Sequence, residues 1–133
     1  MEHITITESE YISVEYIPDR GVIYHTVHKP ISGDPLREAL SAGANYLAKN
    51  GVTKWLSDDR KNGPLPDEDA LWGREWNRRM LDDGWKYWAM VVPEEIHAAE
   101  SLTPVIEELH GWGLRMAVFT SVEDAFTWLD SLD

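Results

Sequence analysis

The sequence predicts a single α/β domain over residues 1–133, with a mostly parallel sheet of about five strands and four main helices. Two observations favour this class. Residues 85–92, except for Lys86, and residues 114–119 are apolar on both faces, as expected for strands that are covered on two sides. Amphipathic segments of helical length separate successive strands, which implies right-handed crossovers between parallel neighbours and leaves one antiparallel edge strand. With 43% hydrophobic residues, the chain can bury one core without disulfide or metal support.

The chain opens with a predicted β-hairpin. Residues 11–17 and 22–28 alternate with β-branched and aromatic side chains. Between them, Pro18-Asp-Arg-Gly21 is a turn signal, because proline presets φ and glycine tolerates positive φ. Residues 3–7 are compatible with a further short edge strand or with a frayed terminus.

A helix is predicted over residues 35–50, with Asp34 as its N-cap and Pro35 at its first position. A strand follows over residues 52–57. Residues 58–66 contain glycine and two prolines, which cannot continue either periodic structure, so they form a loop.

The second helix is predicted to begin at Asp67, which can cap it, and to end before Gly84. Trp72, Trp76 and Met80 recur at four-residue spacing and give this helix one apolar stripe. The stripe indicates the face that packs against the sheet.

Two more segments complete the alternation. Residues 94–100 are expected to form a short turn of helix, and a more definite helix starts at Thr103 before the strand at 114–119. The final helix begins at Ser121, which has the capping-box spacing to Asp124.

Composition excludes several classes of function. The chain has 12 basic and 24 acidic side chains, and its net charge of −12 repels nucleic acid and anionic lipid. There is no cysteine, so disulfides and thiolate chemistry are excluded. We recognise neither a signal peptide nor a membrane span, and we expect a soluble cytoplasmic protein.

A few segments of the chain resemble a known fold. They are Trp55-Leu-Ser-Asp-Asp-Arg60, Trp72, Trp76, Gly84-Trp-Lys-Tyr-Trp-Ala-Met-Val-Val-Pro93 and Glu123-Asp-Ala-Phe-Thr-Trp-Leu129. Through these segments the chain is similar, over about residues 11–132, to the SpoIIAA-like fold of anti-sigma-factor antagonist (STAS) domains and SEC14-type lipid-binding domains, and to small stand-alone bacterial members of unassigned function. The resemblance implies sequential strands with all crossover helices on one sheet face, and a homodimer whose partner covers the other face.

One departure from this family bears on regulation. Its antagonists carry a phosphorylated serine in an Asp-Ser-Ser-Gly motif at the start of the second crossover helix. Here the corresponding region reads Ser57, Asp58, Asp59, Arg60 and then a long loop. Ser57 precedes the loop rather than beginning a helix, so regulation by phosphorylation is not predicted.

The candidate site lies where this strand ends. Asp58 or Asp59 could act as an acid or base or bind a hard cation, and Arg60 could clamp an anionic group. The competing interpretation is structural, with the acids bound to loop amides and Arg60 paired locally, and it is the stronger of the two.

The tryptophans allow two interpretations as well. Trp55, Trp72 and Trp76 could wall an apolar pocket, but the same spacing is explained by core packing, which we favour. Histidines 25 and 28 are three apart on a strand and therefore point to opposite faces, so no metal site is predicted. No serine has a nucleophile-elbow context, and no cofactor is indicated.

The sequence thus favours a non-enzymatic, dimeric STAS-like domain that binds a protein partner through the loop after the strand at 52–57 and the second helix. The expected contact residues are Trp55, Ser57, Asp58, Asp59, Arg60, Trp72 and Trp76. The first alternative is a binder of a small apolar or lipid-like ligand in a tryptophan-lined pocket with Arg60 near its mouth. An enzyme that uses Asp58 or Asp59 is the third hypothesis.

Overall fold

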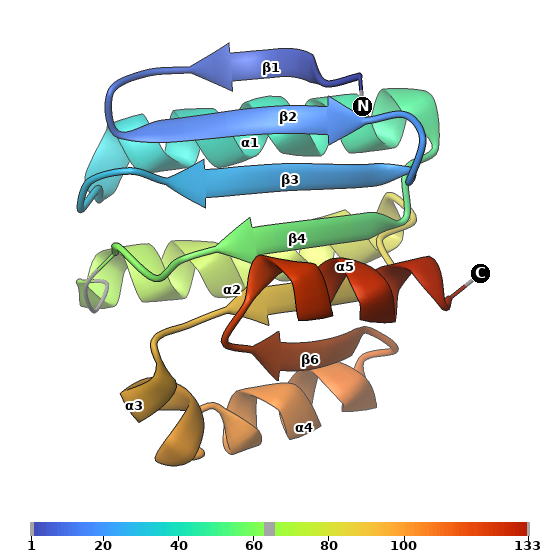
Figure 1. Ribbon diagram of the computed structural model, residues 1–133. Helices are drawn as coiled ribbons and strands as arrows, with labels where there is room; N and C mark the ends of the chain where they lie inside the picture. Colours follow the sequence, from blue (N-terminus) through green and yellow to red (C-terminus); the bar gives the residue numbers. More distant parts are fainter. Residues whose placement is uncertain (1, 63–65, 133) are drawn as a thin grey trace.

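Six strands form one sheet in which every strand lies beside its neighbours in sequence, in the order β1-β2-β3-β4-β5-β6 (Figure 1). The computed structural model describes residues 2–62 and 66–132. The first three strands pair antiparallel and the last four pair parallel. The strands are β1 Ile4–Glu8, β2 Ile12–Ile17, β3 Val22–Val27, β4 Lys54–Asp58, β5 Tyr87–Val91 and β6 Arg115–Phe119.

The helices form a layer on each side of this sheet. Residues of α1, α2 and α4 pack into the larger hydrophobic cluster, on one face. Helix α5 packs into a second cluster on the opposite face, in front of β5 in Figure 1, whereas α1 and α2 lie behind the sheet. The helices are α1 Gly33–Asn50, α2 Asp67–Asp82, α3 Glu94–Ala98, α4 Thr103–Gly111 and α5 Val122–Asp130.

The α/β class is confirmed, but two details of the sheet were predicted wrongly. The described residues form six strands rather than about five, because the segment around Ile4 forms β1 against β2. The strand that runs against the others is β2, and it lies inside the sheet rather than at its edge, because β1 covers its free side. Residues 63–65 of the predicted loop lie outside the described residues.

Two predicted helix caps also differ. Helix α1 begins at Gly33 with Ser32 as its N-cap, and α2 begins at Asp67 after Pro66, so Asp34 and Asp67 lie inside the first turns. There an acidic side chain interacts favourably with the helix dipole, although it does not cap the helix. The cap predicted for the final helix is present, since the Ser121 Oγ accepts a hydrogen bond from the backbone N–H of Asp124.

Trp55 is the centre of the larger cluster. Its side chain is 1% exposed and lies against Gly43 of α1, where an added Cβ would come within 2.4 Å of the indole ring. Trp76 of α2 and Trp85 meet it edge to face, with ring centroids 5.3 and 6.4 Å away. The glycine in α1 therefore lets the helix approach the sheet over a large aromatic side chain.

The second face was expected to need a partner subunit, yet α5 of the same chain covers it over β4, β5 and β6. This helix is fixed at its C-terminal end by Lys54, whose Nζ donates to the carbonyls of Leu129 and Leu132 at 2.7 and 2.8 Å. Arg20 adds an ion pair with Asp130 at 2.7 Å.

In the described part of the chain, none of the helices has both the length and the apolar character that a membrane span requires.

Candidate functional site

The candidate site lies at the carboxyl end of β4, beside the end of β3. Successive side chains of a strand point to opposite faces of the sheet. Trp55 accordingly packs with the helices α1 and α2, whereas Leu56 packs under α5. The same alternation separates Asp58 and Asp59, which are neighbours in sequence but bind groups on different faces of the sheet.

On the face of α1 and α2, three side chains form a hydrogen-bonded chain. The Trp55 indole N–H donates to Nδ1 of His25 at 2.9 Å, and Nε2 of His25 lies 2.9 Å from Oδ1 of Asp59. An indole nitrogen can only donate, so Nδ1 must be the acceptor and Nε2 carries the proton that His25 donates to Asp59. Imidazole and carboxylate are therefore held in place by a buried core residue.

On the face of α5, Asp58 and Arg60 bind each other. The guanidinium donates from Nε and from one terminal nitrogen to the two carboxylate oxygens, at 2.9 and 2.8 Å. The Asp58 side chain is 8% exposed and that of Arg60 is 45% exposed. Hydrogen bonding to Asp58 raises the pKa of the Arg60 guanidinium. Arg60 thus neutralises the charge of Asp58, and the donors that it uses for this pair are not directed at a substrate anion.

Tyr24 belongs to the same face of the sheet. Burial raises the pKa of its phenol above the ordinary value of 10.0, and the negative charges of Asp58 and Glu15 act in the same direction. A hydrogen bond with Thr26 and the charge of Arg60 oppose the shift. At neutral pH the phenol remains protonated and acts as a neutral polar group.

Ser57 is buried. It is 1% exposed, and its Oγ accepts a hydrogen bond from the Trp88 indole N–H at 2.8 Å. A second serine, Ser13, lies 2.7 Å from Nε2 of His28, which the sequence did not indicate. Ser13 is also buried, and among the described residues no carboxylate is hydrogen-bonded to this histidine. The geometry therefore builds no catalytic triad around either serine.

The loop after β4 is fastened to the start of α1. The backbone N–H of Ile31 donates to Oδ1 of Asn62 at 3.0 Å. The buried Asp69, near the start of α2, accepts from the N–H of Gly33 at 2.9 Å and from the Arg37 side chain at 3.1 Å. A buried carboxylate needs such partners. These bonds hold the first turn of α2 beside the first turn of α1.

The outer face of α2 carries exposed apolar surface next to this fastening. Leu71 is 68% exposed. Beside it, Trp72 is half-buried, stacks on Trp76 at 6.2 Å between ring centroids, and has the Arg37 guanidinium 5.8 Å from its ring centre. Sequence reasoning identified Trp72 but missed Leu71, because the helical stripe of tryptophans indicated only the buried side.

The expected contact residues therefore fall into separate sets. Trp55, Ser57 and Trp76 are buried, at 8% exposure or less, and Asp59 binds His25 on their face. Asp58 and Arg60 lie on the opposite face, so Arg60 is not at the mouth of a tryptophan pocket. Of the three tryptophans expected to contact a partner, Trp72 is the one that is partly exposed.

Hollows in the described surface lie elsewhere. One has a volume of about 310 Å³ and is lined by Arg78, Leu81, Asp82 and Trp112. Another, of about 400 Å³, lies beside β6 and the start of α4. Within residues 2–62 and 66–132, no three histidine, aspartate or glutamate side chains gather in a way that could hold a metal ion.

Sequence reasoning missed the roles of His25 and Asp69. Nothing local to Asp59 shows that β3 places His25 opposite Ser57 in the register of the sheet. Asp69 appears in the sequence as one of several acidic residues at a helix start, and only the tertiary structure shows that it is buried.

Comparisons with known proteins found no matching family model, no matching curated protein and no matching solved structure.

Proposed function

We propose that the protein is a non-enzymatic, cytoplasmic interaction domain of STAS-like type, which binds a partner protein through the outer face of α2 and the adjoining loop. One observation carries the proposal: Leu71 is 68% exposed beside the half-buried Trp72. Large apolar side chains that cluster at the surface inside a polar rim are typical of protein-binding surfaces. Here Arg74 and Glu75, both exposed on the same helix, supply part of such a rim.

The fastening of α2 supports this interpretation. Asp69 and Arg37 fix the first turn of the helix, and stacking on Trp76 limits the motion of Trp72. A surface that is ordered before binding loses less conformational entropy when a partner docks. The buried Trp55 and Trp76 then support the contact surface, because Trp72 packs against Trp76.

The pairing of charged groups supports a non-enzymatic role. Asp58 binds Arg60, Asp59 binds His25, and Asp69 binds Arg37. General acid–base catalysis needs a group that can reach a substrate proton, and these carboxylates are occupied within the fold. The lipid-ligand alternative is less well supported, because Trp55 and Trp76 are packed in the core.

A photo-crosslinking experiment tests the proposal. A photoreactive amino acid at position 71 should capture one dominant partner in the cells that naturally make the protein, and mass spectrometry would identify it. Leu71→Gln keeps helix propensity and removes the apolar anchor, so the affinity of the purified partner should fall at least about tenfold. The matched control is Ile4→Thr, which alters an exposed apolar residue on β1 and should leave affinity unchanged.

Light scattering shows whether the partner is a second copy of the chain or a different protein. If the captured partner is a second copy of the chain, wild-type protein should be dimeric and Leu71→Gln should shift it toward monomer. If Leu71→Gln and Ile4→Thr behave alike in both assays, α2 is not the binding surface and the proposal fails.

A further inference from the structure

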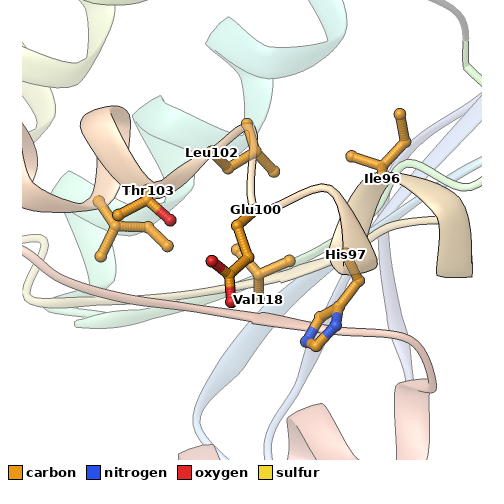
Figure 2. Close-up of a pocket in the computed structure, with 7 residues that line it drawn as sticks. Ile96, His97, Glu100, Leu102, Thr103 and Val118 are labelled. Atoms are coloured by element: carbon orange, nitrogen blue, oxygen red, sulfur yellow. The ribbon is translucent and has the colours of Figure 1, made fainter.

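A hollow of about 400 Å³ lies between the α3–α4 connection and β6, away from the outer face of α2 (Figure 2). Its volume would hold a small molecule, and it is open to solvent, because Ile96, His97, Glu100 and Thr103 are exposed. The wall is largely aliphatic, and Ile96 at its rim is 42% exposed. The residues that line it are Ile96, His97, Glu100, Leu102, Thr103, Ile106 and Val118.

Three polar side chains border this aliphatic wall. In the view of Figure 2, Glu100 and His97 extend from one side of the hollow and Thr103 lies on the other side, and all three residues line it. The hydrogen bonds and ion pairs found in the described part of the chain do not involve these three side chains. They are therefore free to bind a ligand after displacing water.

The backbone holds Glu100 in an unusual conformation. Its φ is 53°, the only positive value among the described non-glycine residues. Backbone bonds fix the turn on both sides, since Glu100 N–H donates to the His97 carbonyl and Thr103 N–H donates to the Glu100 carbonyl, both at 3.2 Å. Glu100 follows the last turn of α3, where a left-handed residue commonly ends a helix, and this backbone conformation sets the position of the carboxylate beside the hollow.

The charge around the hollow selects the sign of the ligand. No lysine or arginine lines it. Two exposed acidic residues on α3, Glu94 and Glu95, add to the negative potential near Glu100. A concave surface bordered by one sign of charge concentrates ions of the opposite sign. The complementary ligand is a cation with an apolar body.

We propose that this hollow binds a small organic amine, with its ammonium group on Glu100 and its hydrocarbon body against Leu102, Ile106 and Val118. The ammonium group donates to the carboxylate, and it can also donate to a ring nitrogen of His97. The charge-assisted bond gives selectivity for a cation, and burial of the aliphatic wall gives the remaining affinity. This site is independent of partner binding at Leu71.

The test compares ligands that share a phenylethyl body and differ in the charge of the head group. 2-Phenylethylamine is titrated into the protein while the methyl signals of isoleucine, leucine and valine are followed by NMR. Saturable shifts are expected at Ile96, Leu102, Ile106 and Val118, with a dissociation constant at least about tenfold lower than that of 2-phenylethanol. The anion 3-phenylpropanoate should bind more weakly than either.

Two variants locate the charge. Glu100→Gln keeps the shape of an exposed side chain and should weaken amine binding about tenfold, with no change in the binding of the alcohol. Glu107→Gln removes one charge from the same helix region but does not line the hollow, so it should bind the amine like wild type. Equal binding of amine and alcohol, or an unchanged Glu100→Gln, would overturn the proposal. Nα-acetyl-lysine amide mimics a lysine side chain within a peptide. If it binds more tightly than 2-phenylethylamine, the ligand is a peptide and the proposal is overturned.

Discussion

Asp58 and Asp59 are identical side chains one residue apart, and the sheet gives them different roles. Asp59 binds His25, which in turn accepts a hydrogen bond from Trp55 at the centre of the larger cluster. Asp58 binds Arg60, whose side chain is half in solvent. The two-residue period of the strand links Asp59 to the core network of Trp55, and it turns the buried Asp58 to the opposite face, where its partner Arg60 is half-exposed. Residue type alone therefore says little about the function of an acid at a strand end.

The first prediction concerns the core on the side of Asp59. Trp55→Ala should lower the free energy of unfolding by about 3–5 kcal/mol, because the indole is buried between α1 and α2. Urea unfolding monitored by circular dichroism would measure this loss. Phe126→Ala on the half-buried surface of α5 is the comparison, and it should cost distinctly less. Equal losses would contradict the view that Trp55 anchors the fold.

The second prediction tests the buried network. His25→Leu should lower the free energy of unfolding by about 1–3 kcal/mol, because it leaves the Trp55 indole N–H and the Asp59 carboxylate without their partner. In a double-mutant cycle with Trp55→Phe, which has no N–H, the two changes should be non-additive. Additive losses would show that the hydrogen bond contributes nothing to stability.

The third prediction applies to the other face. Asp58→Asn should cost less than about 1 kcal/mol, because the half-exposed Arg60 can be hydrated when its partner loses charge. The difference from wild type should shrink further at high salt. A loss as large as that of His25→Leu would mean that the Asp58–Arg60 pair is as deeply coupled to the core as the pair on the opposite face.

The smallest effect is expected from Tyr24, and only in alkaline solution. Burial raises the pKa of its phenol above 10.0, so the folded protein holds this proton more tightly than the unfolded chain does. The resulting stability is complete below pH 10.0 and is lost as the pH rises through the folded-state pKa. Unfolding midpoints across this range should therefore fall more steeply for wild type than for Tyr24→Phe. If the midpoints of wild type and Tyr24→Phe fall in parallel with pH, the pKa of Tyr24 is not raised by folding.

Sequence periodicity was sufficient for most of the fold. The two-sided apolar segments became β5 and β6, and the turn at Pro18 to Gly21 joined β2 to β3. It did not settle β1, whose residues are largely exposed and which is held by pairing with β2. The amphipathic pattern of α5 predicted a buried face, but a helix pattern does not show which side of a sheet the helix covers.

The candidate site was less predictable for a related reason. Its position at the end of β4 follows from the strand pattern, as do the adjacent acids. The partners of those acids depend on how β3 lies beside β4 and how α1 lies beside α2, and such long-range register is not encoded near Asp59 or Asp69. Leu71 was missed because exposure is a property of the packed structure.

The sequential strand order also has a consequence for how the chain assembles during synthesis. Each strand pairs with the one made just before it, so the sheet can grow from β1 as the ribosome releases the chain. The smaller apolar cluster, which includes Val22 and Leu56, stays open until α5 emerges and Lys54 binds its last turn. During that interval an uncovered, hydrophobic sheet surface is available to chaperones or to aggregation, and the closing of α5 ends it.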